Sequence, residues 1–160
     1  MNADRPLDSF DRRILAELQV QGDLGPAELS ERVRLSPSQC SRRLQRLKAE
    51  GYVARTVALL DHGRLNLGVS AYVLITLRSH DPERIESFQK LVRTSAEILE
   101  CASTTGEADF VLRVCTRDLD SYNAFLTQKL LRSTEVATAR TSIVLHQHKD
   151  TTELPLDFLA

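Results

Sequence analysis

SPSQCSRRLQRLKAE, residues 36–50, decides the fold of this chain because it predicts a capped helix with two unlike faces. Ser36 can accept a hydrogen bond from an N–H of the first turn, and Pro37 suits the first helical position. At about 100° per residue, one apolar stripe consists of Cys40, Leu44 and Leu47. We therefore expect a helix that begins at Pro37 and packs on this side.

The other side of this helix carries polar side chains about a third of a turn away. They are Gln39, Arg42, Arg43 and Arg46. Arginine and glutamine can make bidentate contacts to guanine and adenine edges, and arginine also neutralises phosphate groups. The pattern fits a helix that enters DNA, but taken alone it also fits an ordinary solvated basic helix. The neighbouring sequence has to decide between the two.

A short helix is expected immediately before this one. Residues 25–33, GPAELSERV, predict an amphipathic helix with Pro26 at its first position and apolar residues four apart. Only Arg34 and Leu35 separate it from residues 36–50. Two helices joined by so tight a turn match the helix-turn-helix layout, in which the second helix lies in the major groove.

A third helix is expected at residues 7–22, LDSFDRRILAELQVQG. Asp8 or Ser9 can cap its start, and Gly22 offers a stop. Its apolar stripe consists of Phe10, Ile14 and Leu18. The three helices can share one small core. After a C-cap at Gly51, the run YVARTVALL at 52–60 is rich in Val, Tyr and Thr and predicts a strand or two, the wing of a winged helix.

Local charge supports contact with DNA better than the total charge does. The whole chain has a net charge of −1, whereas residues 32–55 contain seven Lys or Arg and one acid, Glu50, an excess of +6. A basic patch confined to the predicted recognition region indicates selective docking rather than general attraction to polyanions. We expect the affinity for DNA to fall steeply with salt.

The pattern changes after residue 67, where strands and helices alternate. Strands are expected at residues 69–77, 97–105, 109–115 and 137–147. Helices are expected after the caps Asp81 and Asp118. Their apolar stripes are Ile85, Phe88 and Val92 in the first, and Leu119, Tyr122, Leu126 and Leu130 in the second. The order βαββαβ predicts a ferredoxin-like arrangement, with two helices on one face of a four-stranded antiparallel sheet.

The expected fold class is therefore α+β, with two domains. A winged helix-turn-helix DNA-binding domain occupies residues 1–60, a linker residues 61–67, and a ferredoxin-like domain residues 68–160. Because two helices cover only one face of the sheet, the other face needs a partner, which predicts a dimer through this domain. A twofold dimer of helix-turn-helix units is expected to bind a pseudo-palindromic DNA site.

The composition and the ends of the sequence give expectations about location, the state of the cysteines and the C-terminal tail. No apolar run approaches the roughly 18 residues of a membrane span, and the N-terminus lacks the apolar stretch of a signal peptide, which favours a cytoplasmic location. Cys40, Cys101 and Cys115 are odd in number and widely spaced, which favours reduced thiols. A polar stretch at 146–153 precedes LPL at 154–156, and we expect this tail to dock on a neighbouring subunit.

The segments described so far resemble the leucine-responsive regulatory protein (Lrp/AsnC) family, also called feast/famine regulators. The similarity covers nearly the whole chain, and its main segments are LDSFDRRIL at 7–15, LSPSQCSRRLQRL at 35–47, EGYV at 50–53, GEADFVLRV at 106–114 and TSIVL at 141–145. The resemblance implies a sequence-specific transcriptional regulator whose ferredoxin-like domain, called RAM, dimerises and binds an amino-acid effector. It implies higher oligomers built from dimers, such as octamers. It also places Ser38, Gln39, Arg42, Arg43 and Arg46 at the DNA surface.

The resemblance further implies an effector site in the loop between the second and third strands. The family's Gly-Asp-x-Asp-aromatic pattern corresponds to Gly106, Glu107, Ala108, Asp109 and Phe110, with Glu107 in place of the usual Asp. Backbone N–H groups of such a turn can receive an α-carboxylate, and Asp109 an α-ammonium. An ordinary hairpin turn is the alternative. Further hydroxyl contacts can come from Ser103, Thr104, Thr138 and Ser142.

Two other functions stay open. An effector-independent protein that organises DNA would use the same basic helix, and an enzyme-regulatory module would use the ferredoxin-like domain, since fold alone does not settle function. His146 and His148 point to the same side of the last expected strand, but no third ligand accompanies them at a recognisable spacing. The sequence also contains no Gly-rich phosphate loop, nucleophile elbow or HExxH pair. We therefore expect no catalytic residues, no metal and no cofactor.

Overall fold

The computed structural model describes residues 6–156, whose contacts form two compact units. Among the described residues, the first unit consists of residues 6–59 together with 149–156, and the second of residues 60–148. The division at residues 61–67 stays a prediction. The C-terminal segment lies with the first unit of its own chain, whereas the sequence favours docking on a neighbouring subunit.

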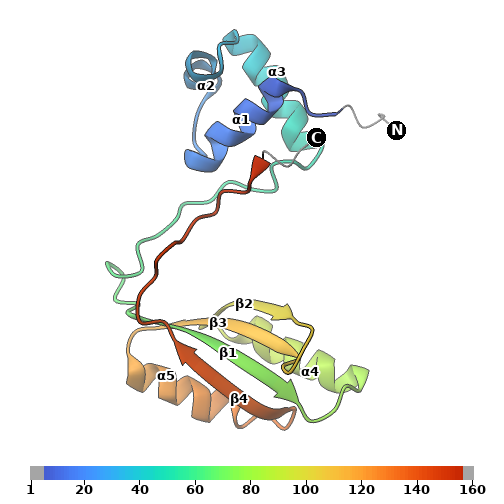
Figure 1. The fold of residues 1–160 in the computed structure, drawn as a ribbon, viewed down its shortest axis with the longest axis vertical. Coiled ribbons are helices and arrows are strands. Elements are labelled where there is room, and N and C mark those ends of the chain that lie inside the picture. Colours follow the sequence, from blue (N-terminus) through green and yellow to red (C-terminus); the bar gives the residue numbers. More distant parts are fainter. Residues whose placement is uncertain (1–5, 157–160) are drawn as a thin grey trace. The chain divides into compact units, whose positions relative to one another are not determined.

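The first unit contains three helices, α1 (Ser9–Val20), α2 (Pro26–Val33) and α3 (Pro37–Ala49) (Figure 1). They enclose one core, whose buried members are Ile14, Leu15, Leu24, Leu29, Val33, Cys40 and Leu47. Leu44 packs against this core, so the apolar stripe predicted for α3 is confirmed. Between α2 and α3 the chain turns at Arg34, which has a φ of 58° in the left-handed region.

Side-chain caps begin α1 and α3 where the sequence predicts them. Asp8 Oδ1 accepts hydrogen bonds from the backbone N–H groups of Phe10 and Asp11, both at 2.9 Å. Ser36 Oγ accepts one from the N–H of Gln39 at 3.3 Å. The side chains of Asp11 and Gln39 accept in return from the N–H groups of the two caps, at 3.1 and 3.0 Å. These reciprocal bonds satisfy donors that a helix start leaves without intrahelical partners.

No strand forms within residues 52–60, contrary to the prediction of wing strands there. The chain leaves α3 through Gly51, whose φ of +80° suits glycine at a helix C-terminus. It then continues without ladder pairing, and Val57 and Leu59 remain 59% and 74% exposed. Residues rich in Val and Thr favour an extended backbone, but a strand also needs a neighbour to pair with. The described part of this unit offers none.

The second unit is a four-stranded antiparallel sheet with the order β2-β3-β1-β4, covered on one face by helices (Figure 1). Its strands are β1 (Val69–Leu77), β2 (Ile98–Ser103), β3 (Phe110–Thr116) and β4 (Val136–Ile143). Its helices are α4 (Pro82–Thr94) and α5 (Leu119–Phe125), the latter continued by the π-helical turn η1 (Leu126–Leu130). The predicted order βαββαβ is confirmed, although β4 ends four residues before residue 147, where the sequence places its end.

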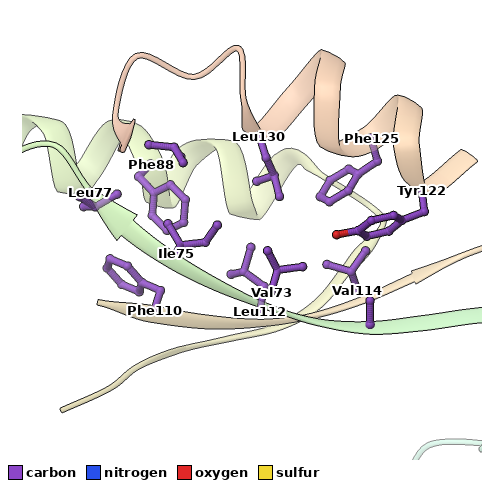
Figure 2. Packing of buried hydrophobic residues seen from close by; sticks show 12 residues of the cluster. Val73, Ile75, Leu77, Phe88, Phe110, Leu112, Val114, Tyr122, Phe125 and Leu130 are labelled. Carbon is purple, nitrogen blue, oxygen red and sulfur yellow. The ribbon is translucent and has the colours of Figure 1, made fainter. Parts of the chain in front are cut away.

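The core of the second unit lies between the helices and one face of the sheet (Figure 2). Phe88 of α4 is fully buried, and its ring lies 4.9 Å from that of Phe110 on β3. The stripe predicted for α4 is confirmed, since Ile85 and Val92 pack against the core that contains Phe88. The stripe predicted for α5 is only partly correct. Leu119 is 58% exposed, and Phe125 is buried in the core instead.

The Asp81 side chain does not cap α4 as predicted. Its carboxylate accepts a hydrogen bond from Ser79 Oγ at 2.5 Å and makes no side-chain bond to the N–H groups of the helix. Asp118 does cap α5, accepting from the N–H of Ser121 at 2.7 Å. Hydrogen bonds from the side chain and the backbone N–H of Ser121 are the main reason that the pKa of Asp118 is lowered to about 2. Within residues 6–156, no helix has the length and hydrophobicity needed to cross a bilayer.

Replacing Phe88 with Ala should lower the free energy of unfolding of the second unit by about 3–5 kcal/mol, because the fully buried ring leaves a cavity. Urea unfolding of the full chain, followed by circular dichroism, measures the change. Leu99→Ala on β2 is the matched control, since this side chain is 46% exposed and its loss should cost less than about 0.5 kcal/mol. Equal losses in the two variants would contradict the described core.

Candidate nucleic-acid interface and ligand loop

The predicted DNA-contacting residues of α3 fall into two groups in the structure. Ser38, Gln39 and Arg42 are exposed. Arg43 and Arg46 lie closer to the neighbouring helix, and their side chains are only 19% and 22% exposed. The helical-wheel argument places Gln39 and the three arginines on one side of the helix, and the family resemblance adds Ser38. The structure instead separates side chains that face solvent from side chains that face α1.

The second group is held by a buried carboxylate on α1. Asp11 is fully buried, and its two oxygens accept hydrogen bonds from Arg43 Nη1 at 2.7 Å and Arg46 Nη2 at 2.5 Å. Arg43 Nη1 also donates to Asp8 Oδ2 at 2.7 Å. A buried carboxylate needs such charged donors to offset its lost hydration. The two arginines therefore fasten α3 to α1.

Asp8 and Arg43 each stabilise the charged form of the other. Burial alone would raise the pKa of Asp8, but the Asp11 backbone N–H and the Arg43 guanidinium lower it to about 2. Burial would likewise lower the pKa of Arg43, but hydrogen bonds to Asp8 and Asp11 raise it instead. The Arg43 guanidinium also lies 5.6 Å from the centre of the Phe10 ring, within the range of a cation–π contact. The cluster thus holds Arg43 in one charged, oriented state.

The face of α3 turned away from the core presents Ser38, Arg42 and Gln45, which are all exposed. These positions follow the spacing i, i+4, i+7 and so share one side of the helix. The sequence prediction does not include Gln45. Its spacing from Ser38 is the signal that could have identified it. Asp8 and Asp11, at the start of α1, could likewise have been identified as partners for the arginines. This face carries a guanidinium, an amide and a hydroxyl, which suit base edges and phosphates.

The predicted effector loop joins β2 and β3 and is shaped by internal hydrogen bonds. Gly106 has a φ of +123°, which side-chain-bearing residues rarely adopt. Thr104 Oγ1 donates to the carbonyl of Ala108 at 2.7 Å, and the Thr104 N–H donates to the carbonyl of Asp109 at 3.0 Å. Ala108 is buried, whereas Gly106 and Glu107 are exposed at the tip. The four predicted residues therefore form one ordered turn with an accessible end.

The carboxylate of Asp109 is engaged within the fold. Its Oδ2 accepts from the N–H of Leu77 at 2.7 Å, and its Oδ1 lies 2.7 Å from Nε2 of His80. The contact with His80 is the main reason that the pKa of Asp109 is lowered, and the Leu77 N–H adds to it. His80 was not predicted, because nothing in the sequence links it to a residue so far along the chain. At the tip, Glu107 Oε2 accepts from Arg140 Nη2 at 3.0 Å.

The other candidate polar residues are placed differently. Thr138 and Ser142 of β4 lie opposite Thr76 and Tyr72 of β1, on the side of the sheet away from the helices. His146 and His148 lie beyond the end of β4 rather than in a strand, with their rings 4.7 Å apart. In residues 6–156, no group of three His, Cys, Asp or Glu side chains could hold a metal ion.

Two family models match the chain. A model described as winged helix-turn-helix DNA-binding matches residues 7–54, which include all three helices of the first unit. A model described as Lrp/AsnC ligand binding domain matches residues 70–154, which include all of the sheet except Val69, the first residue of β1, and also the loop between β2 and β3. The two matches thus contain both candidate sites.

Individual relatives match nearly the whole length. Leucine-responsive regulatory proteins of Klebsiella pneumoniae and Escherichia coli K12 are each 36% identical to this chain over 150 residues, which is 94% of this chain and 92% of the relative. A transcriptional regulator of Neisseria meningitidis, solved as an L-Met complex, is 40% identical with a TM-score of 0.93, over 96% of this chain and 99% of that one. An AsnC family transcriptional regulator from Agrobacterium tumefaciens is 35% identical with a TM-score of 0.90, over 96% and 100%.

Replacing Asp8 with Asn should make the stability of the first unit less sensitive to acid. Because the pKa of Asp8 is lowered from 3.8 to about 2 on folding, its contribution is present above about pH 4 and is lost as the pH falls towards 2. Urea unfolding at about pH 5 and about pH 3 should show a smaller loss in D8N than in the unmodified chain. Asp23→Asn, at an exposed loop position, should keep the full loss. An unchanged pH dependence in D8N would overturn the described role.

Proposed function

Because this chain belongs to the Lrp/AsnC family of DNA-binding transcriptional regulators with a ligand-binding domain, we propose that α3 reads its operator and that an amino acid bound to the second unit modulates this activity. The observation that carries the first part is the exposed face of α3, which presents Arg42 to solvent while Asp11 holds the two neighbouring arginines.

The predicted DNA-contacting residues take two roles in this proposal. Ser38 and Arg42, on the exposed face, contact base edges and phosphates. Arg43 and Arg46 orient α3 through Asp11, and their positive charge lies beside the reading face. Gln39 combines both roles, because its Oε1 completes the helix cap while its side chain lies at the surface. Arg42 is therefore the residue on which specific binding should depend most.

The amino-acid site is proposed at the loop of Gly106, Glu107, Ala108 and Asp109. The relative from Neisseria meningitidis was solved with L-Met, which supports a ligand of this class. Exposed N–H groups at the turn can receive an α-carboxylate. Asp109 already accepts from Leu77 and His80, but each carboxylate oxygen has a further lone pair for an α-ammonium.

The sheet face opposite the helices is proposed as the dimer interface. It exposes Tyr72, and Leu74 and Val111 beside it are only partly buried. Apolar side chains on an uncovered sheet face indicate a partner surface. We propose a twofold dimer, assembled further into octamers, that binds a pseudo-palindromic site in the cytoplasm and carries out no catalysis.

One observation favours a second candidate function, an effector-independent DNA-organising protein. Glu107 stands where the family pattern has Asp, and it pairs with Arg140 at the tip of the loop. With Asp109 also engaged by His80, both carboxylates of the loop have partners within the chain. A loop whose carboxylates are already paired in this way would need no ligand.

A thermal-shift screen with the twenty amino acids should separate the two functions. A ligand that binds only the folded state stabilises it by about 2.7 kcal/mol at a hundred times its Kd, and therefore raises the Tm of the full chain. We expect at least one amino acid to do so and to change the retardation of operator DNA. If none raises Tm while DNA binding persists, the effector-independent function is correct.

Replacing Arg42 with Ala should weaken operator binding by about 1–3 kcal/mol and leave the free energy of unfolding unchanged within about 0.5 kcal/mol. Arg43→Ala should instead lower stability, by about 1–3 kcal/mol, because it leaves buried Asp11 with one partner fewer. The operator is first recovered by selecting bound genomic fragments, and binding is then measured by gel retardation.

The control is Arg93→Ala on α4, which removes the same charge from an exposed position in the second unit. It should change neither operator affinity nor stability. Full operator affinity in the Arg42 variant would show that another surface reads DNA. Failure to recover any enriched sequence would count against specific recognition itself.

A further inference from the structure

The first unit contains an apolar groove of about 870 Å³ beside its helical core. One wall is the C-terminal half of α1, and a second is the extended chain from Tyr52 to Leu59. Leu44 and Lys48 of α3 contribute as well, and a further wall is the C-terminal segment, through Thr152, Leu154 and Leu156. A segment distant in sequence thus completes the surface of the helix-turn-helix unit.

A single side chain of α1 binds the backbone of this segment. The Leu154 N–H donates to Gln19 Oε1 at 2.6 Å, and Gln19 Nε2 donates to the Leu154 carbonyl at 3.2 Å. The amide group of Gln19 therefore satisfies both polar backbone groups of one residue, as a neighbouring strand would in a ladder. Such a pairing requires an extended backbone at Leu154, and Pro155 favours that conformation in the residue before it.

Leu156 anchors the end of the segment. It is partly buried and packs against the core of the first unit, as do Leu7 and Leu18. Pro155, between the two leucines, has no N–H and so brings no unsatisfied donor into the groove. The hydrogen-bonded Leu154 and the packed Leu156 give the tail two different kinds of attachment within three residues.

We propose that residues 151–156 form a strap that docks on α1 and the helical core along one wall of this groove and ties the helix-turn-helix unit to the ligand-binding unit a second time. The first connection passes from residue 59 to residue 60 and continues into β1, and the strap is reached from the end of β4. These two strands are hydrogen-bonded neighbours, and the Val144 N–H donates to the Ser70 carbonyl at 2.9 Å where both connections leave the sheet. Both connections therefore begin at the same end of one strand pair.

The strap adds a second tether of limited length. Leu154 lies eleven positions after the end of β4 at Ile143, so at about 3.5 Å per extended residue this stretch reaches at most roughly 38 Å. A docked strap therefore limits how far the helix-turn-helix unit can move from the sheet, and its release leaves only the connection that passes from residue 59 to residue 60.

Hydrogen exchange of the full chain, measured by mass spectrometry over residues 150–156, tests the docking. We expect the Leu154 amide to be protected and Gln19→Ala to accelerate its exchange at least tenfold. Leu156→Ala, which leaves α1 intact, should release the strap in the same way. Gln128→Ala, an identical change at an exposed position of η1, should leave exchange unchanged. An unprotected Leu154 amide in the unmodified chain would overturn the proposal.

A cross-linking experiment tests whether the strap belongs to the same chain. With Cys at positions 19 and 154, a short bismaleimide should join the two positions within one chain, which peptide mass spectrometry detects. Variants carrying either Cys alone control for reaction with the native cysteines. A covalent dimer on a denaturing gel would assign the groove to another chain's tail and overturn a same-chain strap. Neither experiment requires DNA or a ligand, so the outcome does not depend on the proposed function.

Discussion

The buried carboxylate of Asp11 is the interaction on which the arrangement of the first unit depends. An ionised group removed from water is stable only if charged donors surround it, and here Arg43 and Arg46 supply them. Both come from α3, so the requirement of one residue on α1 sets the rotation of the recognition helix about its own axis. The exposed side chains of α3 can face outward together because their two basic neighbours face inward.

This division of the arginines also shows where sequence reasoning reached its limit. The caps at Asp8 and Ser36, and the stripe through Cys40 and Leu47, follow from local chemistry and helical period, and the structure contains them. A helical wheel, however, ranks basic residues only by angle. It contains no information about an acidic partner on another helix, so it cannot distinguish an arginine held by the fold from one, such as Arg42, that is exposed.

The ferredoxin-like unit and the segment before it show the same limit of sequence-based prediction. Alternating and continuous apolar runs correctly gave four strands and two helices, because burial on a sheet imposes those periods. Residues 52–60 have the composition of a strand without a partner to pair with. The contact between His80 and Asp109 links residues distant in sequence, and only the pairing of β1 with β3 brings them together. Composition predicts backbone preference, whereas pairing and long-range contacts require the assembled fold.

The docked C-terminal segment has a consequence for synthesis of the chain. The ribosome completes the three helices of the first unit early, but Leu154 and Leu156 emerge only after the whole ferredoxin-like unit has been made. Domains generally fold in order as they emerge. Until residues 154–156 have been synthesised, the nascent helix-turn-helix unit therefore lacks the wall that they form, and the Gln19 amide lacks its Leu154 partner. A chain interrupted before that point would present a binding helix on an incompletely closed unit.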